Sequence, residues 1–156
     1  MSDVPGVRIR AMATADLDGV VDVAAGLREA PDWPRSVYAG ILERSSPKRI
    51  AIVAEDVELG AVVGFAVAVL VPPEAELESI AVAAGWQRRG IARRLFAALA
   101  NELGRSKVGL VLLDVREGNA AARAFYGSMG FVEDGRRAGY YADPVEDAVL
   151  MRMRVG

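Results

Sequence analysis

Residues 80–95 read Ile80-Ala81-Val82-Ala83-Ala84-Gly85-Trp86-Gln87-Arg88-Arg89-Gly90-Ile91-Ala92-Arg93-Arg94-Leu95. An apolar strand runs into a basic turn, and an amphipathic helix follows the turn at once. The first N–H groups of a helix have no partner within it, and with the helix dipole they favour an anion. The glycine in the turn allows the backbone to come close to such a ligand. The stretch therefore predicts a pyrophosphate at the start of this helix.

Length and composition indicate one globular domain spanning residues 1–156. Of the 156 residues, 53% are hydrophobic and 26% charged, which suffices for a core and excludes a disordered chain. A net charge of −2 points to neither a nucleic acid nor an anionic membrane as partner. No apolar run reaches the roughly 20 residues of a membrane helix, and the N-terminus lacks the regions of a signal peptide. We therefore expect a cytoplasmic protein of bacterial type.

The chain has no histidine and no cysteine. This excludes Ser-His-Asp and Cys-His machinery, histidine-based zinc sites and any disulfide framework. No carboxylates are spaced as a ligand set either, so we expect no metal. Acid–base chemistry must fall to Asp, Glu, Lys, Tyr or water.

Hydrophobic periodicity predicts the order strand, two helices, three strands, helix, strand, helix and two strands. The expected segments are a strand at 7–10, a helix capped by Thr14, a short helix burying Val37, Ile41 and Leu42, a hairpin of 49–54 and 61–70, a strand at 76–82, a helix at 92–103 closed by Gly104, a strand at 108–115, a helix from an Asn119 cap to Met129, and strands at 131–132 and 148–153. Strand 108–115 is apolar on both faces, so we expect it to be fully buried. This order predicts an α/β domain with a mixed sheet.

The basic turn matches a known donor-binding pattern. Gln87-Arg88-Arg89-Gly90-Ile91-Ala92 fits the Q/R-x-x-G-x-G/A signature of the GNAT acyltransferase family, between a strand and a helix. It lacks the Gly-Lys-Ser/Thr ending of a Walker loop and the three glycines of a dinucleotide fingerprint. Taken alone, the motif also fits a solvated basic helix start.

Nearly the whole chain resembles the GNAT family. The run from Asn119 to Phe131 reads Asn-Ala-Ala-Ala…Tyr-x-x-x-Gly-Phe, and residues 113–126, 127–131 and 135–148 look like those of one subgroup. That subgroup is the RimI type, the bacterial ribosomal-protein alanine N-acetyltransferases. The resemblance implies the GNAT (acyl-CoA N-acyltransferase) fold, a mixed central sheet flanked by helices.

The resemblance also implies acetyl-CoA as donor substrate. Backbone N–H groups of the turn and helix start would hold its pyrophosphate, with the residues Gln87, Arg88, Arg89, Gly90, Ile91, Ala92 and Arg93. The strand residues Ile80, Ala81 and Val82 would pair with the pantetheine arm as an added strand does. Asn119 would contact the same arm, and it also reads as a plain helix N-cap.

Acetyl transfer to an amine needs a base for the ammonium and gains from an acid for the leaving thiolate. The resemblance makes Tyr126 the acid, although its helix position alone favours an ordinary buried ring. The leaving thiolate is already a good leaving group. We therefore expect the acid to help without being indispensable.

Two carboxylates compete for the role of base. Asp114 ends an apolar strand, where an ionised carboxylate is costly unless it is paired or functional. The RimI type usually has the longer Glu there, so a bridging water is plausible; a structural pair with Arg116 or a loop N–H is the alternative. Glu78, which we expect on one strand face with Glu76 and Ile80, is the second candidate. Two further alternatives stay open: both carboxylates share the role of base, or Glu78 attracts a cationic N-terminus.

Aromatic residues are candidates for binding the acceptor. We expect a peptide groove between the first helix pair and the tail, lined by Trp33, Tyr140 and Tyr141, with core or hairpin packing as the alternative for each. Tyr38 is expected in the core. Acidic residues of the tail give it a negative rim suited to a basic ribosomal protein, or they are plain surface charge.

The expected function is acetyl-CoA-dependent acetylation of a protein N-terminal α-amine, of the ribosomal-protein alanine type, by direct attack in a ternary complex. Two alternatives stay open: a GNAT enzyme acting on a small amine, and a non-catalytic acyl-CoA-binding module. Shared fold and donor site leave the acceptor uncertain. The sequence carries no prediction of oligomeric state.

Overall fold

The fold is α/β, with one mixed sheet and helices on both of its faces. The computed structural model describes residues 6–27, 33–43 and 48–155. Within these ranges the sheet has seven strands in the order β1-β2-β3-β4-β5-β7-β6. The elements are β1 Val7–Ala11, α1 Leu17–Ala25, α2 Arg35–Glu43, β2 Arg49–Asp56, β3 Ala61–Val71, β4 Glu74–Val82, α3 Ile91–Arg105, β5 Leu110–Arg116, α4 Ala120–Met129, β6 Val132–Tyr141 and β7 Glu146–Arg154. The expected fold class and order of elements are confirmed.

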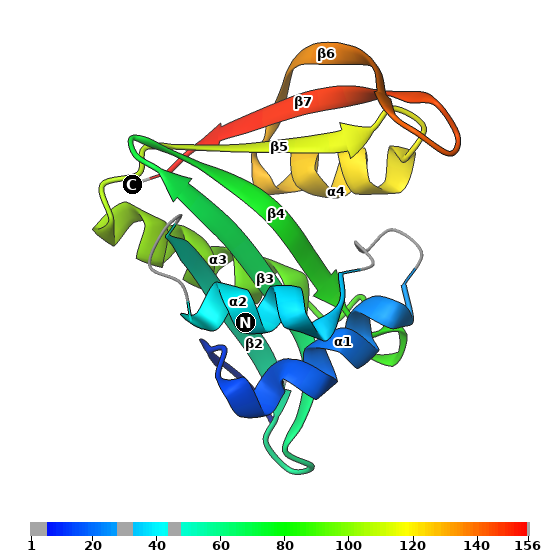
Figure 1. The fold of residues 1–156 in the computed structure, drawn as a ribbon. Helices are drawn as coiled ribbons and strands as arrows, with labels where there is room; N and C mark the ends of the chain where they lie inside the picture. Colours follow the sequence, from blue (N-terminus) through cyan, green and yellow to red (C-terminus); the bar gives the residue numbers. More distant parts are fainter. Residues whose placement is uncertain (1–5, 28–32, 44–47, 156) are drawn as a thin grey trace.

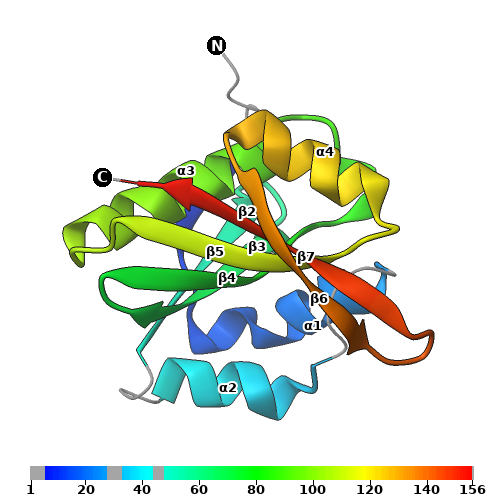
Figure 2. The same ribbon diagram turned by 90° about the horizontal axis from the view of Figure 1, so that it is seen from above.

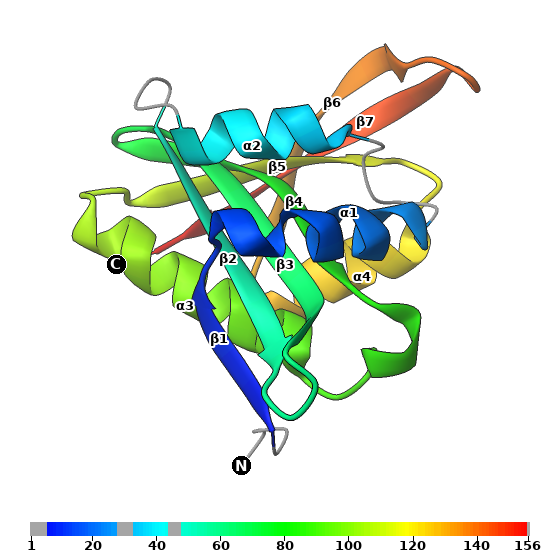
Figure 3. The ribbon, with the colours of Figure 1, turned by 60° about the horizontal axis from the view of Figure 1, so that its bottom comes forward.

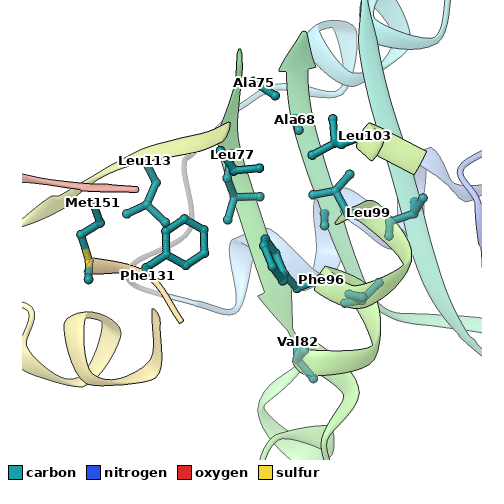
Figure 4. Close-up of a cluster of buried hydrophobic side chains, with 14 of the residues drawn as sticks. Ala68, Ala75, Leu77, Val82, Phe96, Leu99, Leu103, Leu113, Phe131 and Met151 are labelled. Atoms are coloured by element: carbon teal, nitrogen blue, oxygen red, sulfur yellow. The ribbon is translucent and has the colours of Figure 1, made fainter. Parts of the chain in front are cut away.

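Two pairs of helices cover the two faces of the sheet (Figure 2). On the α1–α2 face, Tyr38 and Phe65 belong to one buried cluster. On the α3–α4 face, Leu113 and Phe131 belong to a larger cluster (Figure 4). The helix α3 contributes a stripe that is at most 1% exposed, as its i, i+4 spacing predicts: Ile91, Leu95, Leu99 and Leu103.

The sheet consists of two antiparallel parts joined by one short parallel pairing. β1, β2, β3 and β4 are antiparallel neighbours (Figure 3), as are β5, β7 and β6. β4 and β5 pair only from Glu74 opposite Leu110 to Glu76 opposite Leu112. Beyond these pairs the two strands diverge (Figure 1). Within the described chain, residues 77–82 therefore have no partner strand on that side.

A β-bulge interrupts β4 at Glu78. Leu77 lies opposite Ala68 of β3, but Ser79 lies opposite the adjacent residue Val67. Two residues of β4 thus face one of β3, and Glu78 is the extra residue.

The bulge changes which side chains of β4 share a face. Since strand side chains alternate, one extra residue moves every later side chain to the opposite face. Glu76 lies opposite Val69 on the α1–α2 face, whereas Ile80 packs against the α3–α4 cluster. The expectation that Glu76, Glu78 and Ile80 share one face is therefore wrong for Ile80.

The starts and ends of two helices also differ from expectation. A 3₁₀ turn, Thr14–Asp16, precedes α1, and the Asp16 carboxylate accepts the N–H of Ala13 at 2.7 Å. The side chain at the start of α1 is thus Asp16, and the expected Thr14 cap is wrong. α3 continues through Gly104 and ends at Arg105, because Gly104 keeps a helical backbone. In α2, Val37 is exposed and Tyr38 takes the buried position.

Two strands differ from their expected form. β5 is not fully buried: Leu113 and Val115 are buried, while Asp114 between them is half-buried. β6 is ten residues long, where only residues 131–132 were expected to be extended. The first nine residues of this edge strand are exposed, so the sequence carries no apolar alternation there. Within the described ranges, none of the helices has the length and apolar character needed to cross a membrane.

Candidate active site

A cleft of about 1320 Å³ opens where β4 and β5 diverge. It runs from the start of α3, past both diverging strands and α4, to the turn between β6 and β7. The three predicted catalytic residues, Glu78, Asp114 and Tyr126, all line it. So does every predicted donor-binding residue except Arg89. The divergence of the two strands therefore brings together most of the residues selected from the sequence.

The turn before α3 is shaped to bind an anion. Arg88 and Gly90 both have positive φ, 64° and 80°, which curls the backbone so that successive N–H groups point the same way. The first hydrogen bond of α3 runs from the N–H of Arg94 to the carbonyl of Gly90 at 3.1 Å. The N–H groups of residues 91–93 precede it and lack helical partners. This arrangement suits the pyrophosphate expected from the sequence.

Side chains of the turn brace it against the strand. Gln87 Nε2 donates to the carbonyl of Val82 at 2.9 Å and ties the turn to the end of β4. The guanidinium of Arg89 lies 4.9 Å from the ring centre of Trp86, outside the cleft lining. Arg93 lines the cleft and donates to the Ser128 hydroxyl of α4 at 2.7 Å.

Asn119 caps α4 at the edge of the cleft. Its Oδ1 accepts the N–H of Ala122 at 3.1 Å, which confirms the N-cap. The cap uses only the carbonyl oxygen of the side chain. Its NH₂ group donates to no described residue, so a ligand in the cleft is a possible acceptor for it.

Tyr126 lies on α4 with its ring packed between Phe125 and Phe131, at centroid distances of 5.5 and 5.7 Å. Burial, with a smaller contribution from Tyr141, raises the pKa of Tyr126 to about 12. The hydroxyl bonds to no side chain or backbone group that the structure describes. Tyr126 therefore keeps its proton throughout the neutral range.

The side chain of Asp114 has no ion pair or hydrogen bond with any described residue. Arg116, its expected structural partner, instead contacts Glu146 at 3.1 Å. A bond to a loop N–H is likewise absent from the described chain. Both structural explanations considered for Asp114 are therefore wrong, and its carboxylate is open to the cleft.

Glu78 is already paired. Arg49 of β2 donates to both of its carboxylate oxygens, at 2.7 and 3.1 Å. Both oxygens of Glu78 are thus engaged, and a contact with an amine would have to replace one of these charge-assisted hydrogen bonds. Burial, together with the charges of Asp114 and Glu78, raises the pKa of the neighbouring Glu76. Two carboxylates, Asp114 and the Arg49-paired Glu78, line this part of the cleft, and Glu76 lies beside them.

Asp114 and Tyr126 reach the cleft from opposite faces of the sheet. Leu113 and Val115 belong to the α3–α4 cluster, so Asp114 between them points to the α1–α2 face. Tyr126 packs against the α3–α4 cluster. Tyr141 lies between the two: Asp114 contributes to its raised pKa, after burial, and it contributes to that of Tyr126. An acceptor entering from one face can thus meet a donor bound from the other.

Arg116 organises the wall of the cleft beside Asp114. Its guanidinium lies 4.4 Å from the ring centre of Tyr141. It donates to the carbonyls of Ala142 and Pro144, both at 3.2 Å, and pairs with Glu146. One side chain thereby holds the ring and the following turn in place.

The other predicted acceptor residues lie outside the cleft lining. Trp33 packs against Tyr38, with ring centres 5.5 Å apart, at the edge of the α1–α2 cluster. Tyr140 is 48% exposed and contacts Tyr141 and Arg137. Of the predicted aromatic residues, only Tyr141 lines the cleft, so roles for Trp33 and Tyr140 need an acceptor that extends beyond it.

Several residues of the cleft were not selected from the sequence. Leu27 after α1 and Glu146 of β7 line it, as does Ser79 of β4. Simple alternation along β4 groups Ser79 with the buried core positions Ala75 and Leu77. A bulge at Glu78 turns Ser79 toward the α1–α2 face. None of the sequence patterns that we used predicts this bulge.

Comparison with known proteins shows the family of this chain. The model of the acetyltransferase (GNAT) family matches residues 21–131. The chain belongs to the GNAT family. An N-alpha-acetyltransferase RimI from Mycobacterium tuberculosis is 34% identical to this GNAT protein, over 99% of this chain and 97% of that one.

Two further matches come from Escherichia coli: one is a sequence and the other is a crystal structure. The ribosomal protein bS18-alanine N-acetyltransferase of strain K12 is 41% identical over 98 residues, which cover 62% of this chain. The match spans 66% of that protein's length. The crystal structure of the ribosomal-protein-S18-alanine N-acetyltransferase superposes with a TM-score of 0.82 at 31% identity, covering 96% of this chain and 94% of that one.

Proposed function

We propose that residues 1–156 form one acetyl-CoA-dependent N-acetyltransferase domain that acetylates the N-terminal α-amine of a protein. The observation that carries this proposal is the cleft through the sheet, with an anion-binding helix start at one end and, at the other, the Asp114 carboxylate, which no described residue pairs with. The name of the Escherichia coli relative, a ribosomal protein bS18-alanine N-acetyltransferase, supports a ribosomal protein beginning with alanine as acceptor. We use this name only to propose the acceptor.

The donor is acetyl-CoA in this proposal. The N–H groups at the start of α3 hold its pyrophosphate, and Arg88 and Arg93 add positive charge. The unpaired side of β4 over residues 80–82 accepts the pantetheine arm, as a sheet edge accepts an extra strand. The free NH₂ of Asn119 donates to the same arm.

Transfer then needs two proton movements. Asp114, directly or through a water, takes a proton from the ammonium, whose ordinary pKa is about 8. The freed nitrogen attacks the thioester carbonyl, a C–N bond forms and the C–S bond breaks. Tyr126 gives its proton to the leaving thiolate, and the remaining excess proton of the nitrogen replaces it. No covalent enzyme intermediate forms.

Negative charge favours a cationic acceptor on the α1–α2 face. Glu76 and Asp114 lie on this face, and Tyr141 and Glu146 continue the wall. An N-terminal ammonium is attracted by these carboxylates before it is deprotonated. We propose that this charge, with the ring of Tyr141, positions the first residue of the peptide.

The direct test is a mass-spectrometric screen with acetyl-CoA. Peptides beginning with alanine, the same peptides with a blocked N-terminus, and small amines are incubated side by side. We expect one acetyl group on the free alanine peptides and none on the blocked ones. Robust turnover of small amines without peptide turnover would favour a small-molecule enzyme. Tight CoA binding without any turnover would favour a binding module.

A further inference from the structure

Ser79 lines the cleft and carries a buried hydroxyl. The residue is 6% exposed, and its Oγ has no hydrogen-bond partner among the residues that the structure describes. Leaving a buried hydroxyl unsatisfied is unfavourable, and native structures rarely do so without a functional reason. Something other than the described chain should therefore bind this group.

The bulge at Glu78 determines where this hydroxyl points. Ser79 lies opposite Val67, which belongs to the α1–α2 cluster, so its side chain points to the same face. Asp114 points to that face as well, from the other diverging strand. Both residues follow the last β4–β5 pair, that of Glu76 with Leu112. Ser79 and Asp114 thus flank the opening of the sheet on the side proposed for the acceptor.

We propose that the Ser79 hydroxyl accepts a hydrogen bond from the acceptor amine and holds its nitrogen for attack. This inference rests on the proposed function. A primary amine that has lost one proton keeps two N–H groups and a lone pair. One N–H donates to Ser79 Oγ, the other proton leaves during amide formation, and the lone pair faces the thioester. The hydroxyl then restricts the rotation of the amine without competing for the lone pair.

The test compares stability with kinetics in three variants. Ser79→Ala removes a hydroxyl that has no partner within residues 6–27, 33–43 and 48–155, so we expect its free energy of unfolding to equal or exceed that of wild type. We expect kcat/KM for an alanine peptide to fall about 3- to 10-fold, as for one lost hydrogen bond. KM for acetyl-CoA should not change. Ser79→Thr keeps the hydroxyl and should restore most of the loss.

Ser106→Ala is the matched control. Ser106 Oγ donates to the carbonyl of Glu102 at 3.2 Å at the far end of α3, outside the cleft lining. This variant should lose a little stability and keep wild-type kinetics. It therefore shows the opposite pattern to Ser79→Ala.

Each outcome has a distinct meaning. An active wild type with unchanged kcat/KM in Ser79→Ala would overturn this inference and leave the proposed function standing. A parallel loss of stability and activity in Ser79→Ala would also overturn it, since that pattern indicates a structural bond. A wild type that acetylates no amine would overturn both proposals.

Discussion

At the scale of single residues, pairing distinguishes the two candidate bases better than sequence position does. From the sequence, Asp114 and Glu78 were both carboxylates on strands next to the donor turn. The structure shows Glu78 bound through both oxygens by Arg49 and Asp114 without a partner in the described chain. A strand sequence does not reveal which distant arginine faces which carboxylate. Tertiary contacts therefore add a second argument for Asp114, which the sequence already placed first.

Tyr126 is expected to affect rate without affecting the pH profile. Because burial raises its pKa to about 12, it stays protonated between pH 6 and 9. We expect Tyr126→Phe to lower kcat by a similar factor, about 10- to 100-fold, at every pH in this range. Steady-state rates at five pH values check this.

A contrary result is simple to recognise. If Tyr126→Phe removed an alkaline decline in kcat below pH 9, the phenol would be titrating there. The proposal that Tyr126 stays protonated until it donates to the leaving thiolate would then be wrong. Phe125→Leu, on the same helix, is a control for loss of ring packing.

At the scale of elements, Asp16 is the clearest structural residue near the start of α1. It is buried, accepts hydrogen bonds from the two terminal nitrogens of Arg10, Nη1 and Nη2, both at 2.8 Å, and accepts the N–H of Ala13. The hydrogen bond from Arg10 lowers the pKa of Asp16. A carboxyl with a lowered folded pKa contributes stability above its unfolded pKa of about 4. That contribution is lost as pH falls through the folded pKa.

We expect Asp16→Asn to reduce the free energy of unfolding by about 2 kcal/mol at pH 7, since it removes one of the two carboxylates that pair with Arg10 and leaves only Glu55. The difference from wild type should shrink as pH falls below 4. Urea unfolding at several pH values measures it. Asp18→Asn is the matched control, because Asp18 pairs with Arg35 in an exposed position and should change stability by less than about 1 kcal/mol. Equal effects of the two substitutions would contradict this account.

Elements with strong periodicity were predictable, and elements set by tertiary contacts were not. The stripe of α3 and the Asn119 cap of α4 followed from local pattern. The bulge at Glu78 and the full length of β6 did not, because each depends on the neighbouring strand. Two of the three aromatic residues expected to line the acceptor groove, Trp33 and Tyr140, lie away from the cleft lining for the same reason.

At the scale of the whole molecule, the chemistry depends on an opening in the sheet. The parallel pairing of β4 with β5 ends after three residue pairs, and the cleft forms beyond it. The donor turn, recognisable in the sequence, lies at one end of this cleft. The acceptor side combines β4, β5 and the β6–β7 turn, which are distant in the chain. For this reason the sequence predicted the donor more firmly than the acceptor.

The most direct test of this account compares two variants in one assay. The rate of acetyl transfer to an alanine peptide is measured at neutral pH for wild type, Asp114→Asn and Glu78→Gln. We predict that Asp114→Asn lowers kcat about 100-fold or more, as expected for loss of a general base, and that Glu78→Gln lowers it much less. A larger loss of kcat in Glu78→Gln than in Asp114→Asn would contradict the account.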